Sequence, residues 1–237
     1  MAGFLAERDS TARELMDDPA CDPDALRRTY DRFALVNAAV SGQRAVYRKW
    51  IRPRLRRDRA LRLLDIGTGG GDLPRRVLRW ARRDGMRVEA VGIDPDARSI
   101  GFAREQPEMP GLRFEQADSR AVSETGERFD VVVSNHVLHH LDDAARDALL
   151  ADSERLLLPG GVAVHGDIER SRLAYAAFAA ATWPLQGTLL RGTFIRPDGL
   201  TSIRRCATAS EMAAALPPGW RVRRAFPSRL EAIHEAL

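Results

Sequence analysis

Short apolar runs alternate with longer amphipathic stretches through the middle of the chain. The apolar runs predict strands at Leu61–Ile66, Arg87–Ile93, Leu112–Gln116, Phe129–Ser134 and Gly161–Asp167. They lack a strict alternation of apolar and polar residues, as expected for strands whose two faces are both covered. The stretches between them predict helices at Leu73–Asp84, Asp96–Glu105 and Asp142–Leu157. This order predicts a doubly wound, mostly parallel α/β sheet with its ligand at the carboxyl ends of the strands.

The regions that flank this core have different patterns. Residues before 61 are predicted to be helical, with a short helix at Phe4–Met16 and one or two more at Asp24–Arg57. After the core, an antiparallel pair at Ser202–Cys206 and Arg221–Phe226, separated by a helix at Ala209–Ala215, would complete seven strands. A length of 237 residues suits one α/β domain with appendages. We therefore expect a helical segment at 1–60 and a core domain at 61–237.

An uncharged segment, LAYAAFAAATWPLQGTLL, covers residues 173–190. Thr182, Pro184 and Gln186 interrupt it too often for a membrane-spanning helix of about 20 apolar residues. We expect two helical pieces that are broken at Pro184, because proline removes a backbone donor from a helix interior. A dimer interface or docking at a membrane surface would also explain the segment. A monomer or homodimer and a peripheral membrane contact therefore stay open.

Composition and charge narrow the compartment and the partners. Hydrophobic residues make up 44% and charged residues 30% of the chain, as in soluble globular proteins. The net charge is +4, and the densest basic run spans residues 48–59. We interpret this run as a solvated surface, although binding of nucleic acid is an alternative. Cys21 and Cys206 lack metal-ligand spacing, and no apolar leader follows Met1, so we expect a cytoplasmic protein.

The stretch LLDIGTGGGD, at residues 63–72, is the most informative part of the chain. It predicts a strand, a tight turn and the start of a helix, and its glycines let a ligand lie directly against the backbone. Gly67 and Gly69 fit the turn of dinucleotide enzymes, but Asp72 stands where that pattern ends in glycine. A carboxylate there would repel a pyrophosphate and attract a cation. The turn therefore favours S-adenosylmethionine, which carries a sulfonium and an ammonium group.

Acidic residues follow the next two predicted strands. Asp94 ends the second strand, where a carboxylate can accept hydrogen bonds from both hydroxyls of a ribose. Asp94 could instead cap the next helix, although Asp96 can fill that role. Asp118 ends the third strand and could accept from an adenine amino group, or it could be a solvated loop acid.

The motifs together resemble those of class I S-adenosylmethionine-dependent methyltransferases. They are LLDIGTGGGD, VEAVGIDPD, FEQADS, FDVVVSNHVLHHL and LLLPGGVAVHGD, which follow in the usual order. The fourth motif and the tail resemble methyltransferases of ubiquinone, menaquinone and polyketide biosynthesis. The resemblance implies a Rossmann-like methyltransferase fold with an N-terminal helical lid and a second lid inserted at residues 171–200. It implies that the cofactor is bound by Asp65, Gly67, Thr68, Gly69, Asp94, Pro95, Asp118, Ser119, Asn135 and His136.

Aromatic residues of the two predicted lids are candidates for the substrate site. Tyr30 and Phe33 belong to the N-terminal segment, and plain packing onto the domain explains them equally well. Tyr175, Phe178 and Trp183 belong to the uncharged segment, and we expect them to face an apolar pocket.

Histidines cluster after the fourth predicted strand, where the transferred methyl group is expected. Transfer to a phenol or enol requires loss of a proton, which histidine can accept near neutral pH. His139 is the first candidate for this base and His140 the second, although either could simply pack against the sheet. The spacing of His136, His139 and His140 could suggest a metal, but no Cys or Glu accompanies it, so no metal is predicted.

Further candidates lie near the fifth strand and beyond. His165 and Asp167 alternate along that strand and are predicted to face the cleft from one side. Asp167 could orient a substrate hydroxyl or a histidine. The sequence Arg196-Pro197-Asp198-Gly199 predicts a turn, in which Arg196 and Asp198 are weaker candidates for contact with the substrate.

These features favour methylation of a hydroxyl on a hydrophobic aromatic or polyketide-like small molecule. C-methylation of a quinol-like ring carbon needs the same cleft and is the main alternative. An RNA methyltransferase and a non-catalytic cofactor-binding protein are further alternatives. Methylation of a nucleobase amine is disfavoured because Ser134-Asn135-His136-Val137 replaces the Pro-Pro-aromatic motif that such enzymes carry.

Overall fold

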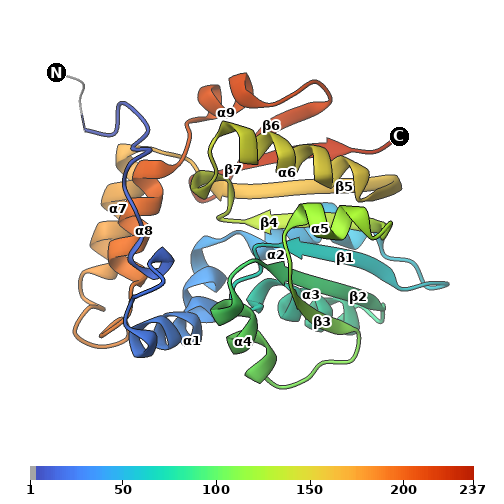
Figure 1. Ribbon diagram of the computed structural model, residues 1–237, viewed down its shortest axis with the longest axis horizontal. Coiled ribbons are helices and arrows are strands. Elements are labelled where there is room, and N and C mark those ends of the chain that lie inside the picture. Colours follow the sequence, from blue (N-terminus) through green and yellow to red (C-terminus); the bar gives the residue numbers. More distant parts are fainter. Residues whose placement is uncertain (1–3) are drawn as a thin grey trace.

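Seven strands form one sheet in the computed structural model, which describes residues 4–237 (Figure 1). They are β1 (Leu61–Ile66), β2 (Val88–Asp94), β3 (Leu112–Gln116), β4 (Phe129–Asn135), β5 (Leu157–Ile168), β6 (Trp220–Ala225) and β7 (Arg229–Glu235). Their order is β3-β2-β1-β4-β5-β7-β6. β1 to β5 pair in parallel, whereas β7 is antiparallel to both β5 and β6. The predicted doubly wound, mostly parallel, seven-stranded sheet is therefore confirmed.

Helices cover both faces of the sheet because successive side chains of a strand point to opposite faces. The helices of the core are α3 (Asp72–Arg83), α4 (Ala97–Glu105), α5 (Ser119–Glu124), α6 (Asp143–Arg155) and α9 (Ala209–Ala215). Leu63 packs with α3 and with the helical turns at Tyr47–Ile51. Its neighbour Leu64 packs on the opposite face with α5, α6 and α9. Both faces are thus buried, as the apolar strand runs predict.

Four helices lie outside these two layers or lead into them. They are α1 (Pro23–Val40), α2 (Gln43–Val46), α7 (Arg172–Thr182) and α8 (Ile195–Arg205). Figure 1 shows α1, α7 and α8 grouped at one end of the sheet, where β1 and β4 terminate. This end is the carboxyl end of the parallel strands. Among the described residues, no helix combines the length and the apolar character that crossing a bilayer requires.

The structure corrects the predicted helix at Phe4–Met16. The first three residues lie outside the described chain, and from residue 4 onward the segment contains only a helical turn at Leu15–Asp17. Tertiary contacts hold it instead. The amides of Leu15 and Met16 donate to the Asp198 carboxylate at 2.8 and 3.0 Å. Because its contacts come from distant residues and not from one face of a regular helix, this segment needs no helical spacing of apolar residues.

The predicted strand at Ser202–Cys206 is also wrong, because these residues end helix α8 or follow it directly. Helix α8 buries Ile195, Asp198, Ser202 and Ile203 at helical spacing. Two of these buried residues are polar, so the apolar periodicity is hidden. The strand that pairs with β6 is β7, which was not predicted.

The uncharged segment forms one helix rather than two. α7 ends at Thr182, and residues 183–191 form turns. The sequence 196–199, predicted to be a turn, lies in the first part of α8. Trp183 is 69% exposed and does not face an apolar pocket.

Candidate active site

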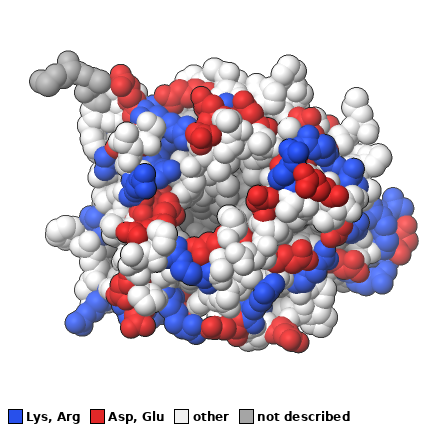
Figure 2. All heavy atoms as spheres, viewed as in Figure 1, with Lys and Arg blue, Asp and Glu red and all other residues white. Residues whose placement is uncertain are grey.

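A cavity of about 420 Å³ opens at the carboxyl ends of β1, β2 and β4, beneath α1, α7 and α8. Figure 2 shows a hollow in the surface with acidic side chains around it. Most of the predicted site residues line the cavity: Tyr30, Phe33, Asp65, Gly67, Thr68, Gly69, Asp94, Pro95, Asn135, His136, His139, His140 and Phe178. Both ends of the predicted site, the glycine turn and the histidines, thus meet in one cavity.

The glycine turn after β1 has the backbone that its sequence predicts. Gly67 and Gly69 both have positive φ, +67° and +53°, a region that L side chains rarely adopt. A Cβ on Gly67 would lie 2.5 Å from Val137 Cγ2, whereas a Cβ on Gly69 would meet no atom within 4 Å. Gly67 therefore permits close packing against the segment after β4, and Gly69 leaves open space for a ligand.

Acidic side chains surround this turn. Asp94 Oδ2 accepts from the Gly69 amide at 2.9 Å, and its Oδ1 accepts from the Asp96 amide at 2.9 Å. Asp65 Oδ2 accepts from the Thr68 hydroxyl at 2.7 Å. Burial raises the pKa of Asp94, and it raises the pKa of Asp65 to about 8. Asp65 and Asp94 therefore hold the turn against the ends of β1 and β2. Because burial disfavours their charged forms, a nearby positive charge would stabilise both carboxylates.

The whole cavity carries an excess of negative charge. Among the described residues, seven acidic side chains line it and no Lys or Arg does. The acidic residues are Glu14, Asp17, Asp65, Asp72, Asp94, Asp96 and Asp198. An acidic wall of this kind attracts a cationic ligand and repels an anionic one.

His139 is buried between two carboxylates. Its Nδ1 lies 2.8 Å from Asp167 Oδ1, and its Nε2 lies 3.1 Å from Glu14 Oε1. Burial alone would lower the pKa of His139, but the Asp167 carboxylate outweighs it and raises that pKa well above the ordinary value. Both ring nitrogens are therefore occupied here, and the role of His139 as the base remains a prediction.

His140 stands beside His139 with a similar arrangement. Its Nδ1 lies 3.1 Å from Asp17 Oδ2, and its Nε2 lies 3.7 Å from Glu14 Oε1. We call Glu14, Asp17, His139, His140 and Asp167 the acid–histidine cluster. The sequence excluded a metal because no Glu or Cys accompanies the histidines. That reason is wrong, since Glu14 lies next to both histidines in the fold.

Arg229 of β7 supports the floor of the cavity. This arginine is 2% exposed, and it donates to Asn135 Oδ1 and, at 3.2 Å, to His136 Nε2. His136 must therefore carry its ring proton on Nδ1 when neutral. Burial and the nearby guanidinium lower the pKa of His136 to about 3. His136 is thus a neutral residue with a fixed tautomer.

Asp118 and Ser119 do not line the cavity. Asp118 caps α5 by accepting from the Ala121 amide at 2.8 Å, and the Ser119 hydroxyl donates to Asp152 at 2.8 Å. They begin a helix that the sequence analysis did not predict. Their predicted contact with adenine remains a prediction.

Three substrate candidates also lie outside the cavity lining. His165 is fully buried, with its ring nitrogens 2.8 and 3.0 Å from the hydroxyls of Ser134 and Ser153. The prediction that it faces the cleft is therefore wrong. The ring of Tyr175 packs against Phe4. The guanidinium of Arg196 stacks over Trp183.

Glu14 and Asp17 line the cavity but were not predicted as site residues. Asp198, predicted only as a weaker contact to the substrate, lines it as well. Glu14 and Asp17 come from the N-terminal segment, where no local pattern distinguishes them from surface acids. Asp198 holds that segment in place through the two amides described above. Asp198 and Ser202 are buried on one side of α8. Their helical spacing could have indicated a shared buried face, but only if residues 195–205 had been predicted as a helix.

Comparison with known proteins agrees with this geometry. A family model described as a methyltransferase domain matches residues 30–212. The ubiquinone biosynthesis O-methyltransferase of Cereibacter sphaeroides (strain ATCC 17029 / ATH 2.4.9) is 34% identical over 154 residues, which cover 62% of this chain and 59% of that protein. The protein of the same name from Sinorhizobium medicae (strain WSM419) is 31% identical over 185 residues, which cover 75% of this chain and 71% of that protein.

Solved structures share the fold at low sequence identity. Human N-acetylserotonin methyltransferase, solved with S-adenosylmethionine, has a TM-score of 0.62 at 12% identity and covers 91% of this chain and 56% of that one. The plantazolicin methyltransferase BpumL, solved with S-adenosylhomocysteine and a desmethylplantazolicin analog, has a TM-score of 0.57 at 13% identity. The match covers 87% of this chain and 85% of that one. The methyltransferase fold is therefore confirmed. Since the family model matches more than half of its residues, the chain belongs to the methyltransferase domain family.

Proposed function

We propose that this protein is an S-adenosylmethionine-dependent methyltransferase that methylates a hydroxyl of a hydrophobic, aromatic or polyketide-like small molecule. One observation carries the proposal: a single cavity joins an acidic glycine turn to an aromatic wall and a buried histidine. The names of the relatives support transfer to oxygen rather than to carbon.

The cofactor end of the cavity fits a cation. Its lining is acidic and lacks Lys and Arg, and the space beside Gly69 is open. Asp94 would bind the ribose hydroxyls, and Asp65 would face the positively charged methionine part. When bound, the cofactor supplies a methyl group on a positively charged sulfur.

The other end of the cavity fits a neutral, flat acceptor. Tyr30, Phe33 and Phe178 provide aromatic contacts, and the acid–histidine cluster provides hydrogen-bond acceptors for a hydroxyl. Methyl transfer requires the acceptor oxygen to align with the carbon–sulfur bond, so much of the catalysis is positioning. Substrates that carry a carboxylate or phosphate would be repelled by the acidic wall.

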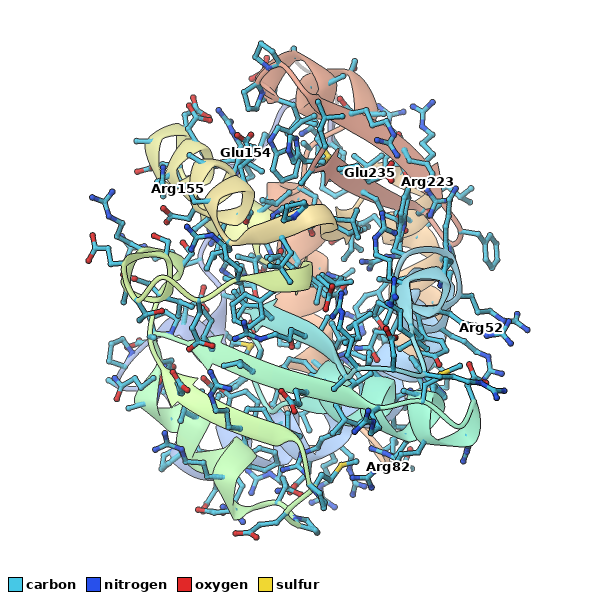
Figure 3. All side chains as sticks on the ribbon, turned by 90° about the vertical axis from the view of Figure 1, so that its right-hand side faces the viewer. Arg52, Arg82, Glu154, Arg155, Arg223 and Glu235 are labelled. Atoms are coloured by element: carbon cyan, nitrogen blue, oxygen red, sulfur yellow. The ribbon has the colours of Figure 1, made fainter. Side chains whose placement is uncertain are left out.

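The basic run at residues 48–59 gives little support to an RNA substrate. Arg54 pairs with Glu235 at 3.1 Å, and Arg59 pairs with Asp130. Both partners lie at the end of the sheet opposite the cavity. Figure 3 views that end and shows Arg52 at its periphery. RNA bound there would be far from the reacting methyl group.

The proposal is tested with the purified protein and methyl-labelled S-adenosylmethionine. Neutral phenols, matched carboxylated phenols, transfer RNA and an organic cell extract are offered as acceptors. Label that enters neutral, solvent-extractable products, with the methyl on oxygen by mass spectrometry, is the expected result. Label in RNA, label on carbon, or no transfer with any acceptor would contradict the proposal.

Cofactor binding should depend on pH through Asp65. The pKa of this buried carboxyl is about 8 without a ligand, and a cationic ligand would lower it. Binding below pH 8 should therefore release a proton, and affinity should rise as the pH increases toward 8. Calorimetry at pH 6.5 in buffers of different ionisation enthalpy measures this release. Asp65→Asn should abolish it, and heats that do not depend on the buffer in the wild type would contradict the assignment.

A further inference from the structure

We propose that Glu14, His139 and His140 form a binding site for a divalent first-row transition-metal ion in the wall of the cavity. The proposal extends the function proposed above, because the ion would face the acceptor end of the same cavity. All three residues line this cavity, and each can offer one ligand atom. The three ligand atoms lie within 4.8 Å of one another.

The spacing of the donor atoms matches that of metal ligands. Glu14 Oε1 lies 3.1 Å from His139 Nε2 and 3.7 Å from His140 Nε2. Two ligands at about 2.1 Å from one ion are separated by about 3.0 Å at a right angle and about 3.4 Å at a tetrahedral angle. The two observed distances lie close to this range, so small movements of the side chains would complete the site.

Both histidines have the supporting contacts that metal-binding histidines usually have. A ligating imidazole commonly binds a carboxylate through its other nitrogen, which fixes the ring and its tautomer. His139 Nδ1 lies 2.8 Å from Asp167, and His140 Nδ1 lies 3.1 Å from Asp17. Both Nε2 atoms are thereby directed toward Glu14. A single buried histidine needs only one hydrogen-bond partner to be stable. Here two carboxylate–histidine pairs both face a third carboxylate, which is the arrangement of a metal site.

The remaining ligand, Glu14, is also held in place. The Ser202 hydroxyl donates to its Oε1 at 2.7 Å. Earlier in the same segment, Arg8 donates to the carbonyl groups of His139 and Leu141, each at 3.1 Å. The N-terminal segment is thus fastened to the histidine turn, and the carboxylate is presented to both rings.

Charge and ligand type define the class of metal ion. A ligating imidazole must be neutral, so binding of a metal ion would displace the proton from Nε2 of His139. The three carboxylates of the acid–histidine cluster would then leave a strongly negative site, which a divalent cation offsets. Two imidazoles and one carboxylate suit Zn²⁺, Fe²⁺, Co²⁺ or Mn²⁺ better than Ca²⁺ or Mg²⁺, which prefer oxygen ligands. With three protein ligands, a bound ion would keep open coordination positions, at which it could bind and polarise an acceptor hydroxyl.

A second group of donors, His139, Asp167 and Cys206, is less suitable. All three residues are buried, and none but His139 lines the cavity. An ion there would have no open position toward the acceptor. We therefore assign Asp167 as the partner that orients His139.

The test uses the full-length protein, stripped with chelator and titrated with Co²⁺. Calorimetry gives the affinity and stoichiometry, and the visible absorption of Co²⁺ reports nitrogen and oxygen ligands. We expect saturable binding of one equivalent by the wild type. Glu14→Gln and His140→Gln should each weaken it by more than about 100-fold, since even supporting residues cost 10- to 100-fold. His234→Gln is the matched control, because this histidine lies on β7, bonded to the Gly219 carbonyl and away from the cavity, and it should bind like the wild type.

Two outcomes would overturn the metal site. The first is an absence of saturable binding by the stripped wild type. The second is equal binding by the wild type and both cluster variants. Methylation assays on the stripped protein separate the two proposals. Methyl transfer without metal binding would support the proposed function and contradict the metal site. Metal binding without transfer to any acceptor would support the metal site and contradict the proposed function.

Discussion

His139→Gln is expected to lower kcat for methyl transfer by about two to four orders of magnitude, with little change in the affinity for S-adenosylmethionine. His139 joins Glu14 to Asp167 in the wall of the acceptor end. Glutamine is similar in size but cannot join both carboxylates with two ring nitrogens, and it is a poor metal ligand. The loss should therefore fall on turnover, whether the histidine moves a proton or holds an ion.

Stability must be measured alongside, because His139→Gln leaves two buried carboxylates without their partner. Breaking such a buried pair costs about 3–5 kcal/mol, which thermal unfolding of the variant would show. His165→Gln is the matched control: it replaces another fully buried histidine, but one that contacts two serines outside the cavity lining. It should retain kcat. Wild-type turnover in His139→Gln, or an equal loss in His165→Gln, would remove His139 from the mechanism.

Asp94→Ala should weaken binding of S-adenosylmethionine by about 100-fold or more. Two hydrogen bonds from a carboxylate to ribose hydroxyls contribute about 3 kcal/mol together, which corresponds to that factor. The same carboxylate also accepts from the Gly69 amide, so its removal frees the glycine turn. Calorimetric titration measures the affinity directly.

Asp142→Ala provides the comparison for Asp94→Ala. Asp142 is another acidic residue between a strand and a helix, and it caps α6 by accepting from the Ala145 amide at 2.8 Å, but it does not line the cavity. Its loss should cost about 1 kcal/mol of stability and leave the affinity unchanged. Unchanged affinity in Asp94→Ala would contradict the ribose assignment.

The strands of the core and the glycine turn were predictable because their signals are local. Runs such as 131–133 are apolar on both faces, and the turn after β1 requires glycine at positive φ. The rule that parallel strands meet at their carboxyl ends then places Asp65, Asp94 and Asn135 together. The same rule also placed Asp118 and Ser119 at the cofactor, but these two residues begin α5 and do not line the cavity.

The last strand escaped prediction because its buried residues include charged ones. In β7, Arg229 and Glu231 are both buried, and Glu231 accepts from the Trp50 indole at 2.9 Å. A buried ionic residue in a central strand looks like a surface position when its partner is unknown. The same effect hid α8, where Asp198 and Ser202 are buried through contacts with the N-terminal segment.

The sequence by itself therefore determined the five parallel strands, the glycine turn and the placement of Asp65 and Asp94 beside that turn. Only the tertiary structure decided the acceptor end. Glu14 and His139 are 125 residues apart, and neither has a neighbour in sequence that indicates the contact. Periodicity reports which side of a helix or strand is buried, but it does not report which distant segment covers that side. The N-terminal segment has no periodicity of its own, so only its packing against α8 and the histidine turn reveals that it completes the site.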